Sequence, residues 1–175
     1  MNLSITTLET PVAPWTVVVD DDGVVVASGF SGEDDTLARL TDAQRENTHR
    51  VDDAGEVTRA IRAYLDGDRD ALDAVAVAQP GGPFHQQVWA AMREIPAGET
   101  WSYVELATKA GRPAASRAAG TACARNLVAP FVPCHRVVKS DGGLGGYYYG
   151  LDVKEWLLNH ERHDAEFRQE RLSES

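Results

Sequence analysis

Short apolar runs alternate with turn signals through the first half of the chain. Residues 15–19 and 24–27 are apolar and rich in valine, and residues 20–23, Asp-Asp-Asp-Gly, favour a tight turn between them. These runs predict a β-hairpin. Apolar residues recur at helical spacing across residues 56–65, which predicts an amphipathic helix, and residues 74–78 have a strand-like composition. The first 78 residues therefore predict a small α/β unit.

Residues 79–83, Gln-Pro-Gly-Gly-Pro, have the composition of a linker. Beyond them a helix is predicted from Phe84 to just before Pro96, with its apolar residues on one face. We therefore expect a boundary between domains at residues 79–83. A second domain is predicted over residues 84–161, followed by a charged, frayed tail over residues 162–175.

Two short helices joined by a tight turn form a helix-turn-helix candidate in the second domain. Ser102 and Glu105 have the spacing of a capping box, in which the Ser hydroxyl and the Glu carboxylate each bond a backbone donor. Gly111 ends this helix, and a second one is predicted over residues 114–125. Over residues 114–122 its side chains are small apart from Arg117, so its backbone can approach a partner closely; close packing against another helix is the alternative.

Residues 142–150 form a glycine-rich loop that contains Tyr147, Tyr148 and Tyr149. The glycines lack the spacing of a dinucleotide-binding fingerprint, so we reject a phosphate-binding loop. Glycines let a chain approach a flat ligand, and tyrosines stack on one, so the loop suits a nucleobase pocket. An ordinary surface loop is the alternative. Residues 151–161 predict a final helix.

The acidity of the chain is confined to its first half. The net charge of −10 argues against a polyanionic partner. However, residues 1–83 carry 6 basic and 16 acidic side chains, whereas residues 84–161 carry 8 and 7. The predicted helix pair has a local surplus of basic residues. These residues form either a face that is simply solvated or a face that binds an anion.

Composition limits what the two cysteines, Cys123 and Cys134, can do. Two thiols provide neither a disulfide framework nor a thiolate cluster for zinc, so we expect no metal. No apolar run reaches the length of a membrane span, and the N-terminus lacks the pattern of a signal peptide. We therefore expect a cytoplasmic protein with no membrane partner.

Residues 133–138, Pro-Cys-His-Arg-Val-Val, place a thiol beside an imidazole at a corner that the proline stiffens. A free thiol titrates above neutral pH, and a neighbouring histidine is one way to form the reactive thiolate. Cys134 is therefore the candidate nucleophile and His135 the candidate base. A Cys-His thiol enzyme and a purely structural corner are both alternatives at this point.

Several segments agree in order and spacing with one known family. They are residues 133–138, the helix-turn-helix candidate with Tyr103 and Arg117, Asn126 eight positions before the cysteine, and residues 156–161, Trp-Leu-Leu-Asn-His-Glu. In these segments the chain resembles the O6-alkylguanine-DNA alkyltransferases, also called methylated-DNA–protein-cysteine methyltransferases. The agreement is strong over residues 84–161. It is looser before them, where residues 10–14 resemble the opening strand of the family.

The resemblance implies a fold and an activity. The fold would be an α/β N-terminal domain of ribonuclease-H-like type, with a small antiparallel sheet plus helices, followed by a mainly helical winged-helix, helix-turn-helix domain. The activity would be repair of O6-alkylguanine, and of O4-alkylthymine, by irreversible transfer of the alkyl group to Cys134, without a cofactor. A nucleoid-associated monomer would bind double-stranded DNA in the minor groove and flip the alkylated base. A non-catalytic lesion-recognition protein is the alternative, although such relatives lack the cysteine.

The resemblance also implies a role for each catalytic residue. Cys134 would attack the alkyl carbon, His135 would take the thiol proton through a water molecule, and Glu161 would orient the imidazole. Asn126 would brace the turn that carries the cysteine. Tyr103 would help to rotate the nucleotide and would stabilise the leaving guanine.

Binding residues follow from the same resemblance. The DNA-binding residues would be Ser116, Arg117, Ala118, Ala119, Gly120, Thr121 and Arg125, with the arginine at position 117 filling the space left by the flipped base. The substrate pocket would be lined by Tyr103, Val137, Gly145, Tyr147, Tyr148 and Tyr149, and the carbonyls of Cys134 and Val137 would hold the base. Many relatives carry smaller residues in place of Tyr148 and Tyr149.

Overall fold

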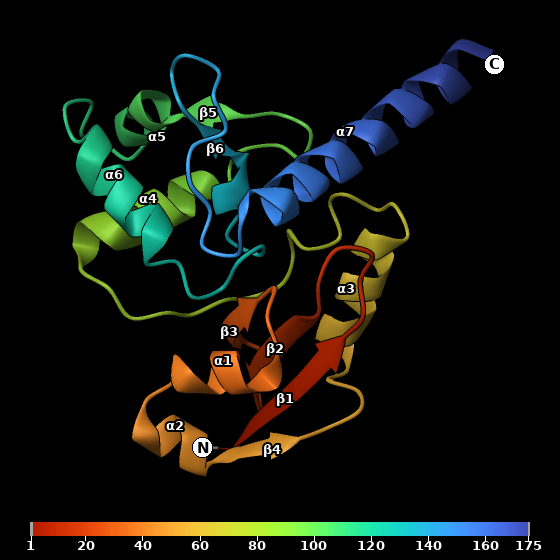
Figure 1. Ribbon diagram of the computed structural model, residues 1–175, viewed down its shortest axis with the longest axis vertical. Coiled ribbons are helices and arrows are strands. Elements are labelled where there is room, and N and C mark those ends of the chain that lie inside the picture. The colour runs from red at the N-terminus through yellow and green to blue at the C-terminus, as the bar shows by residue number, and fades with distance from the viewer. Residues whose placement is uncertain (1, 175) are drawn as a thin grey trace.

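The first half of the chain builds a four-stranded mixed sheet in the order β3-β2-β1-β4 (Figure 1). The structure is a computed structural model that describes residues 2–174, those after residue 162 by their backbone alone. The strands of this sheet are β1 (Leu3–Leu8), β2 (Trp15–Asp20), β3 (Val25–Gly29) and β4 (Thr48–Arg50). The predicted hairpin β2–β3 is confirmed. The expectation of an antiparallel sheet is wrong, because the chain crosses over after β3 and places β4 parallel to β1.

The opening strand lies earlier in the chain than the family resemblance indicates. It is β1, whereas residues 10–14 form a bend outside the sheet. The Thr10 hydroxyl accepts hydrogen bonds from the N–H groups of Val12 (3.2 Å) and Ala13 (3.1 Å). The two prolines in this segment have no N–H to donate to a neighbouring strand, so the segment turns instead of pairing.

Three helices complete the first half: α1 (Glu33–Ala38), α2 (Asp42–Glu46) and α3 (Glu56–Leu65). The bounds of α3 are those predicted, and it buries Val57, Ile61 and Tyr64. A capping box that the sequence analysis missed starts α2, where Thr41 and Gln44 each bond the backbone N–H of the other. The segment between β3 and β4 is largely polar, so its sequence pattern did not predict α1 and α2.

Residues from both halves share the free edge of β3. The strand expected over residues 74–78 is reduced to a single bridge, in which Val77 pairs with Val25. Further along the same edge, Val128 of the second half pairs with Ser28. Because the second half takes up part of this edge, a continuous fifth strand does not form.

Gln79, in the predicted linker, connects the two halves. Its side-chain oxygen accepts a hydrogen bond from the Leu127 N–H at 2.7 Å, and its amide nitrogen donates to Asn126 Oδ1 at 3.1 Å. The linker also ends one residue early, since Pro83 starts the next helix, where its missing N–H costs nothing. The segment is therefore a fixed connection rather than a free one.

Helices around a two-stranded parallel sheet form the second half. Its elements are α4 (Pro83–Met92), β5 (Trp101–Ser102), α5 (Tyr103–Lys109), α6 (Ser116–Ala124), the 3-10 helix η1 (Cys134–Arg136), β6 (Val137–Val138) and α7 (Leu151–Glu174). The pair of helices predicted around Gly111 is confirmed as α5 and α6, and this glycine has a φ of +91°. Ser102 caps α5 through the Glu105 N–H at 3.1 Å. Only this half of the expected capping box forms within the described part of the chain.

The last helix, α7, is longer than predicted. It runs from Leu151 to Glu174 and projects from the body of the molecule in Figure 1, so the backbone expected to fray is helical. Residues 162–174 contain no Gly or Pro and are rich in good helix formers, which lets the helix continue beyond the core. In residues 2–174 no helix is long and apolar enough to cross a membrane.

One hydrophobic core joins the two halves. Trp15 of β2 is fully buried, and its ring contacts those of Phe30, Tyr64 and Phe131. Since Tyr64 lies on α3 and Phe131 lies just before η1, the sheet packs directly against the segment that carries Cys134. The valines of β2 are buried on both faces of the sheet, which explains the unbroken apolar run in the sequence.

We expect Gln79→Ala to lower the free energy of unfolding by about 1–3 kcal/mol, because it leaves the Leu127 N–H without its partner. Urea denaturation followed by tryptophan fluorescence measures this loss. Gln87→Ala, at an exposed position of α4, is the matched control and should change little. Equal effects of the two substitutions would contradict a connecting role for Gln79.

Candidate active site

Cys134 is the first residue of η1 and directly follows Pro133. The Asn126 side-chain amide donates to the Val132 carbonyl at 2.8 Å and to Cys134 Sγ at 3.4 Å. Burial raises the pKa of the Cys134 thiol, and the Asn126 donor opposes this only in part. The cysteine is therefore a neutral thiol in the free protein and needs a base to become a nucleophile.

The side chain of Asn126 is itself fixed by hydrogen bonds. Its side chain is buried, and Oδ1 accepts hydrogen bonds from Gln79 Nε2 and from the Val128 N–H, each at 3.1 Å. Both ends of the amide are thus used, which fixes its orientation. The structure therefore places Asn126 where the sequence analysis expected a brace.

His135 and Glu161 form a fully buried pair in which His135 Nε2 lies 2.9 Å from Glu161 Oε2. The same carboxylate oxygen accepts a hydrogen bond from the Tyr64 hydroxyl at 2.8 Å. The other ring nitrogen, His135 Nδ1, is buried and has no hydrogen-bond partner among the described residues. It is therefore the nitrogen available for chemistry.

Arg136, which the sequence analysis passed over, completes the pair. Its Nε donates to Glu161 Oε1 at 2.9 Å and its Nη2 donates to Oε2 at 3.1 Å, which is a bidentate contact. Its Nη1 donates to the Ile95 carbonyl at 2.7 Å. Its position in the Cys-His-Arg run was a signal, but no local pattern indicated that this arginine is buried.

Electrostatics fix the protonation of the pair. Burial alone would raise the pKa of Glu161, but its interactions with His135 and Arg136 bring it far below its ordinary value. Burial lowers the pKa of His135, despite the opposing attraction of Glu161. The carboxylate can then only accept, so the proton lies on His135 Nε2 and Nδ1 is the basic nitrogen.

A cavity of about 230 Å³ opens beside Cys134. Its other lining residues are Tyr103, Gly120, Cys123, Ala124, Gly146, Tyr147 and Tyr148. A cavity of about 150 Å³ holds a benzene molecule, so this one suits a flat base. Tyr103, Tyr147 and Tyr148 therefore lie where the sequence analysis expected a pocket, whereas Cys123 and the small residues of α6 were not expected there. Among the described residues no three His, Cys, Asp or Glu side chains gather as a metal site.

Three expected pocket residues lie outside this lining. Val137 is fully buried behind the cavity, because its side chain belongs to the core at β6. Gly145 lies behind Tyr103, and a Cβ there would come within 3.1 Å of the Tyr103 hydroxyl oxygen. Tyr149 turns toward the first half, where its hydroxyl donates to the Ser28 carbonyl at 3.4 Å. The side chains of these three residues therefore do not border the cavity, while the expected contact of the base with the Val137 carbonyl stays a prediction.

Lys154 of α7 shapes the glycine-rich loop, and the sequence analysis missed it as well. Its ammonium group is buried and donates to the carbonyls of Val137 (2.8 Å), Leu144 and Gly146 (3.3 Å). Burial lowers the pKa of this lysine. A lysine on a helix normally faces solvent, so no sequence signal pointed to this role.

The expected DNA-binding residues lie on α6 and just after it. Arg117, Thr121 and Arg125 are exposed, and Ser116, Ala118 and Gly120 are half-buried. Ala119 is fully buried, so its side chain does not lie on the exposed face of α6, and its expected place among the DNA-binding residues stays a prediction. Helical periodicity places it on the same inner face as Ala122, against the core.

The fold and the site define a class of protein, one with a mixed sheet, a helix pair and a cysteine next to a buried His–Glu pair. Residues 83–163 match the family model described as 6-O-methylguanine DNA methyltransferase, DNA binding domain. The chain is 39% identical over 150 residues to a methylated-DNA–protein-cysteine methyltransferase of Methanosarcina acetivorans, which covers 86% of this chain and 92% of the relative. The chain therefore belongs to the methylated-DNA–protein-cysteine methyltransferase family, as its sequence motifs indicated.

Solved structures agree with this assignment. The Mycobacterium tuberculosis O6-methylguanine methyltransferase superposes with a TM-score of 0.75 at 30% identity, covering 93% of this chain and 94% of that one. A second structure of the M. tuberculosis protein, in complex with DNA, has a TM-score of 0.75 and covers 94% of each chain at 30% identity. This chain thus has the fold of the family, a small mixed sheet plus helices.

We expect Glu161→Gln to lower the free energy of unfolding by about 3–5 kcal/mol, because it leaves the buried Arg136 guanidinium without its counter-charge. Urea denaturation at neutral pH measures the loss. Glu155→Gln, at an exposed position of the same helix, is the matched control and should have little effect.

The effect of Glu161→Gln should shrink as the pH falls. Glu161 has a lowered pKa in the folded protein, so its stabilisation is complete above its ordinary value of 4.5 and is lost as the pH falls toward the folded value. The difference between the unfolding free energies of wild type and variant should therefore stay constant from neutral pH to about pH 4.5 and shrink below it. A difference that grows on acidification would contradict the ionised carboxylate.

Proposed function

We propose that this protein repairs O6-alkylguanine in DNA by transferring the alkyl group irreversibly to Cys134, once per molecule. One observation carries the proposal. Cys134 lines a base-sized cavity, and the histidine next to it has its tautomer fixed by Glu161. Membership of the methylated-DNA–protein-cysteine methyltransferase family supports it. O4-alkylthymine, which presents the same alkyl–oxygen bond on a flat base, is the proposed second substrate.

The reaction begins with the loss of the thiol proton. His135 Nδ1 receives this proton through a water molecule, and Glu161 stabilises the imidazolium that results. Cys134 Sγ then attacks the alkyl carbon, so that a carbon–sulfur bond forms while the bond from this carbon to O6 breaks. The electron pair of the broken bond leaves with the guanine. The product is a thioether, which is stable, so the protein does not turn over.

Tyr103 stabilises the departing guanine by donating a hydrogen bond to it. Burial raises the pKa of the Tyr103 hydroxyl, which keeps it a donor at neutral pH. The carbonyls of Cys134 and Val137 hold the amino edge of the base. The Val137 oxygen already accepts from Lys154, but a carbonyl has a second lone pair to offer.

Double-stranded DNA binds along α6 in the minor groove, with the damaged base flipped into the cavity. Ser116, Ala118, Gly120 and Thr121 are small and at least partly exposed, so the helix backbone can approach the phosphates with little sequence readout. Arg117 enters the duplex to fill the vacated space, which a planar cation suits. Arg125, at the end of the helix, contacts the backbone of the DNA. These basic residues lie outside the acidic first half.

The domain organisation follows the same proposal. Residues 1–78 form a ribonuclease-H-like domain, which the strand order β3-β2-β1-β4 supports. Residues 84–161 form a winged-helix, helix-turn-helix domain, which the helix pair α5–α6 and the small sheet β5–β6 support. We further propose a monomer that needs no metal or cofactor and works at the nucleoid, in the cytoplasm, because its substrate is chromosomal DNA.

The direct test is incubation with a duplex that contains one O6-methylguanine, followed by intact mass and peptide mapping. We expect a gain of one methyl group on Cys134, in stoichiometric amount, and none in Cys134→Ser. Repair of many lesions per protein would instead indicate a Cys-His thiol enzyme. Tight binding to the lesion without an adduct would indicate a non-catalytic recognition protein.

Arg117→Ala should slow repair of duplex DNA by about tenfold, because the flipped state loses the side chain that fills the gap, while unstacking still costs a few kcal/mol. The same lesion in a single strand needs no such filling, so its repair should slow less. Single-turnover rates on the two substrates give this ratio. Arg59→Ala, on α3, is the control; an equal loss on both substrates would contradict insertion of Arg117.

A further inference from the structure

Arg39 reaches from the first half of the chain to the glycine-rich loop of the active site. It follows α1 directly, and its Nη1 donates a hydrogen bond to the Tyr149 hydroxyl. Its Nη2 donates to the Asn126 carbonyl at 3.2 Å. Its guanidinium carbon also lies 4.4 Å from the centre of the Tyr148 ring, which is a cation–π contact. One side chain thus contacts both tyrosines and the residue that braces Cys134.

Tyr149 occupies a socket in β3. A Cβ on Gly29 would lie 1.8 Å from the Tyr149 hydroxyl oxygen, so the ring fits only because this residue is a glycine. The Tyr149 ring packs edge-on against Phe30, with centroids 6.1 Å apart, and its hydroxyl donates to the Ser28 carbonyl. The loop is therefore anchored in the sheet of the first half.

Tyr148 is the wall of the cavity that this anchor supports. It lines the cavity with Cys134, and it is 66% exposed, so little else packs on it. Its ring packs edge-on against Tyr149 at 4.8 Å, and the Arg39 guanidinium covers one of its faces. Because the loop is rich in glycine and has no regular structure, these contacts set the position of the wall.

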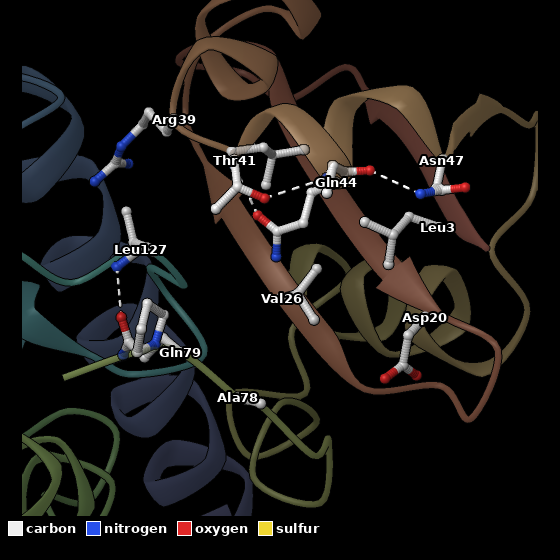
Figure 2. A pocket seen from close by; sticks show the side chains of 13 residues that line it. Leu3, Asp20, Val26, Arg39, Thr41, Gln44, Asn47, Ala78, Gln79 and Leu127 are labelled. Atoms are coloured by element: carbon white, nitrogen blue, oxygen red, sulfur yellow. Dashed lines mark hydrogen bonds between the residues drawn. The ribbon is translucent and has the colours of Figure 1, made fainter. Parts of the chain in front are cut away.

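Figure 2 shows the other side of Arg39, where it borders a second pocket of about 630 Å³ near Gln79 and Leu127. Several polar side chains that line this pocket are bonded within the protein, as the Thr41–Gln44 and Gln79–Leu127 bonds illustrate. Arg39 lies at the boundary between this pocket and the loop, and it donates one hydrogen bond to Tyr149 of the loop and one to the Asn126 carbonyl.

We propose that Arg39 is a positioning residue of the active site, which holds Tyr148, directly and through Tyr149, as a fixed wall and thereby sets the size of the alkyl group that the cavity accepts. The inference rests on the proposed function. With the wall fixed, a methyl group fits beside Cys134 and a bulky group meets Tyr148. When the wall is released, transfer of a methyl group loses its precise geometry, while a bulky group gains room.

The test compares single-turnover rates for duplexes with O6-methylguanine and with O6-benzylguanine. In Arg39→Gln we expect the methyl-to-benzyl rate ratio to fall by about tenfold, because the wall loses its cation and its hydrogen bonds. Arg39→Lys, which keeps the charge but not the two-pronged donor, should recover part of the ratio. Arg59→Gln, an exposed position with one 4.0 Å ion pair, should leave it unchanged. An unchanged ratio in Arg39→Gln overturns the inference, since a general loss of stability would slow both substrates alike.

Tyr149→Phe provides a second variant that keeps the ring in its socket and removes only the hydroxyl. This substitution should also lower the methyl-to-benzyl rate ratio. The double variant Arg39→Gln with Tyr149→Phe should have nearly the same ratio as Arg39→Gln alone, because both substitutions break the same Arg39–Tyr149 hydrogen bond. If the double variant instead showed the sum of the two single reductions in the rate ratio, the proposed link between Arg39 and Tyr149 would be contradicted.

A measurement without DNA separates failure of this inference from failure of the proposed function. Iodoacetamide and N-benzyliodoacetamide alkylate Cys134 directly, and their rate ratio reports the position of the wall. We expect this ratio to fall in Arg39→Gln even in a preparation that repairs no DNA. If the wild-type protein repairs DNA and the alkylation rate ratio of Arg39→Gln equals that of the wild type, the inference about Arg39 is overturned while the proposed function stands.

Discussion

The carboxylate of Glu161 lies out of contact with solvent and accepts four hydrogen bonds, from Tyr64, His135 and Arg136. A buried charge is costly unless it is paired and hydrogen-bonded, so these donors are a condition for the fold. They come from α3 and η1, whereas Glu161 itself belongs to α7. The need to satisfy one carboxylate therefore brings together three segments that are far apart in the sequence.

Burial, with a smaller contribution from the charge of Arg136, limits what this carboxylate does to the pKa of the histidine. A lone carboxylate beside His135 would favour the imidazolium, which has no lone pair with which to accept a proton. The positive charge of Arg136 opposes this, and together with burial it helps to keep the pKa of His135 below its ordinary value. Glu161 is thus left to fix the tautomer, while Nδ1 remains a base. The same ion pair that stabilises the fold keeps the site ready for proton transfer.

The sequence predicted what local patterns encode. The valine runs with an Asp-Gly turn predicted the hairpin, and the helical spacing at Glu56–Leu65 predicted α3 with its bounds. The parallel strand β4 was missed because it is a three-residue strand in a polar segment, and its strand partner, β1, is more than forty residues earlier. Family motifs identified His135 and Glu161 together, since their separation of 26 residues has no local signature.

Buried polar side chains were the harder part to predict. Arg136 and Lys154 are charged residues of types that normally face solvent. Only the tertiary structure shows that backbone carbonyls and a carboxylate accept hydrogen bonds from them. The family resemblance assigned Tyr149 to the pocket together with Tyr147 and Tyr148. The socket at Gly29, more than a hundred residues away, draws it to the sheet instead.

The first half of the chain is therefore part of the active site, although the family model matches only residues 83–163. It supplies the Tyr64 hydroxyl to Glu161 and the Gln79 amide to Asn126. Arg39 adds the contacts to the tyrosine wall. Glu161 contacts His135, Asn126 contacts Cys134, and Tyr148 lines the cavity beside Cys134. The first half thus holds the reactive corner through buried hydrogen bonds, while α6, where the DNA is proposed to bind, belongs to the second half and lies above the sheet in Figure 1.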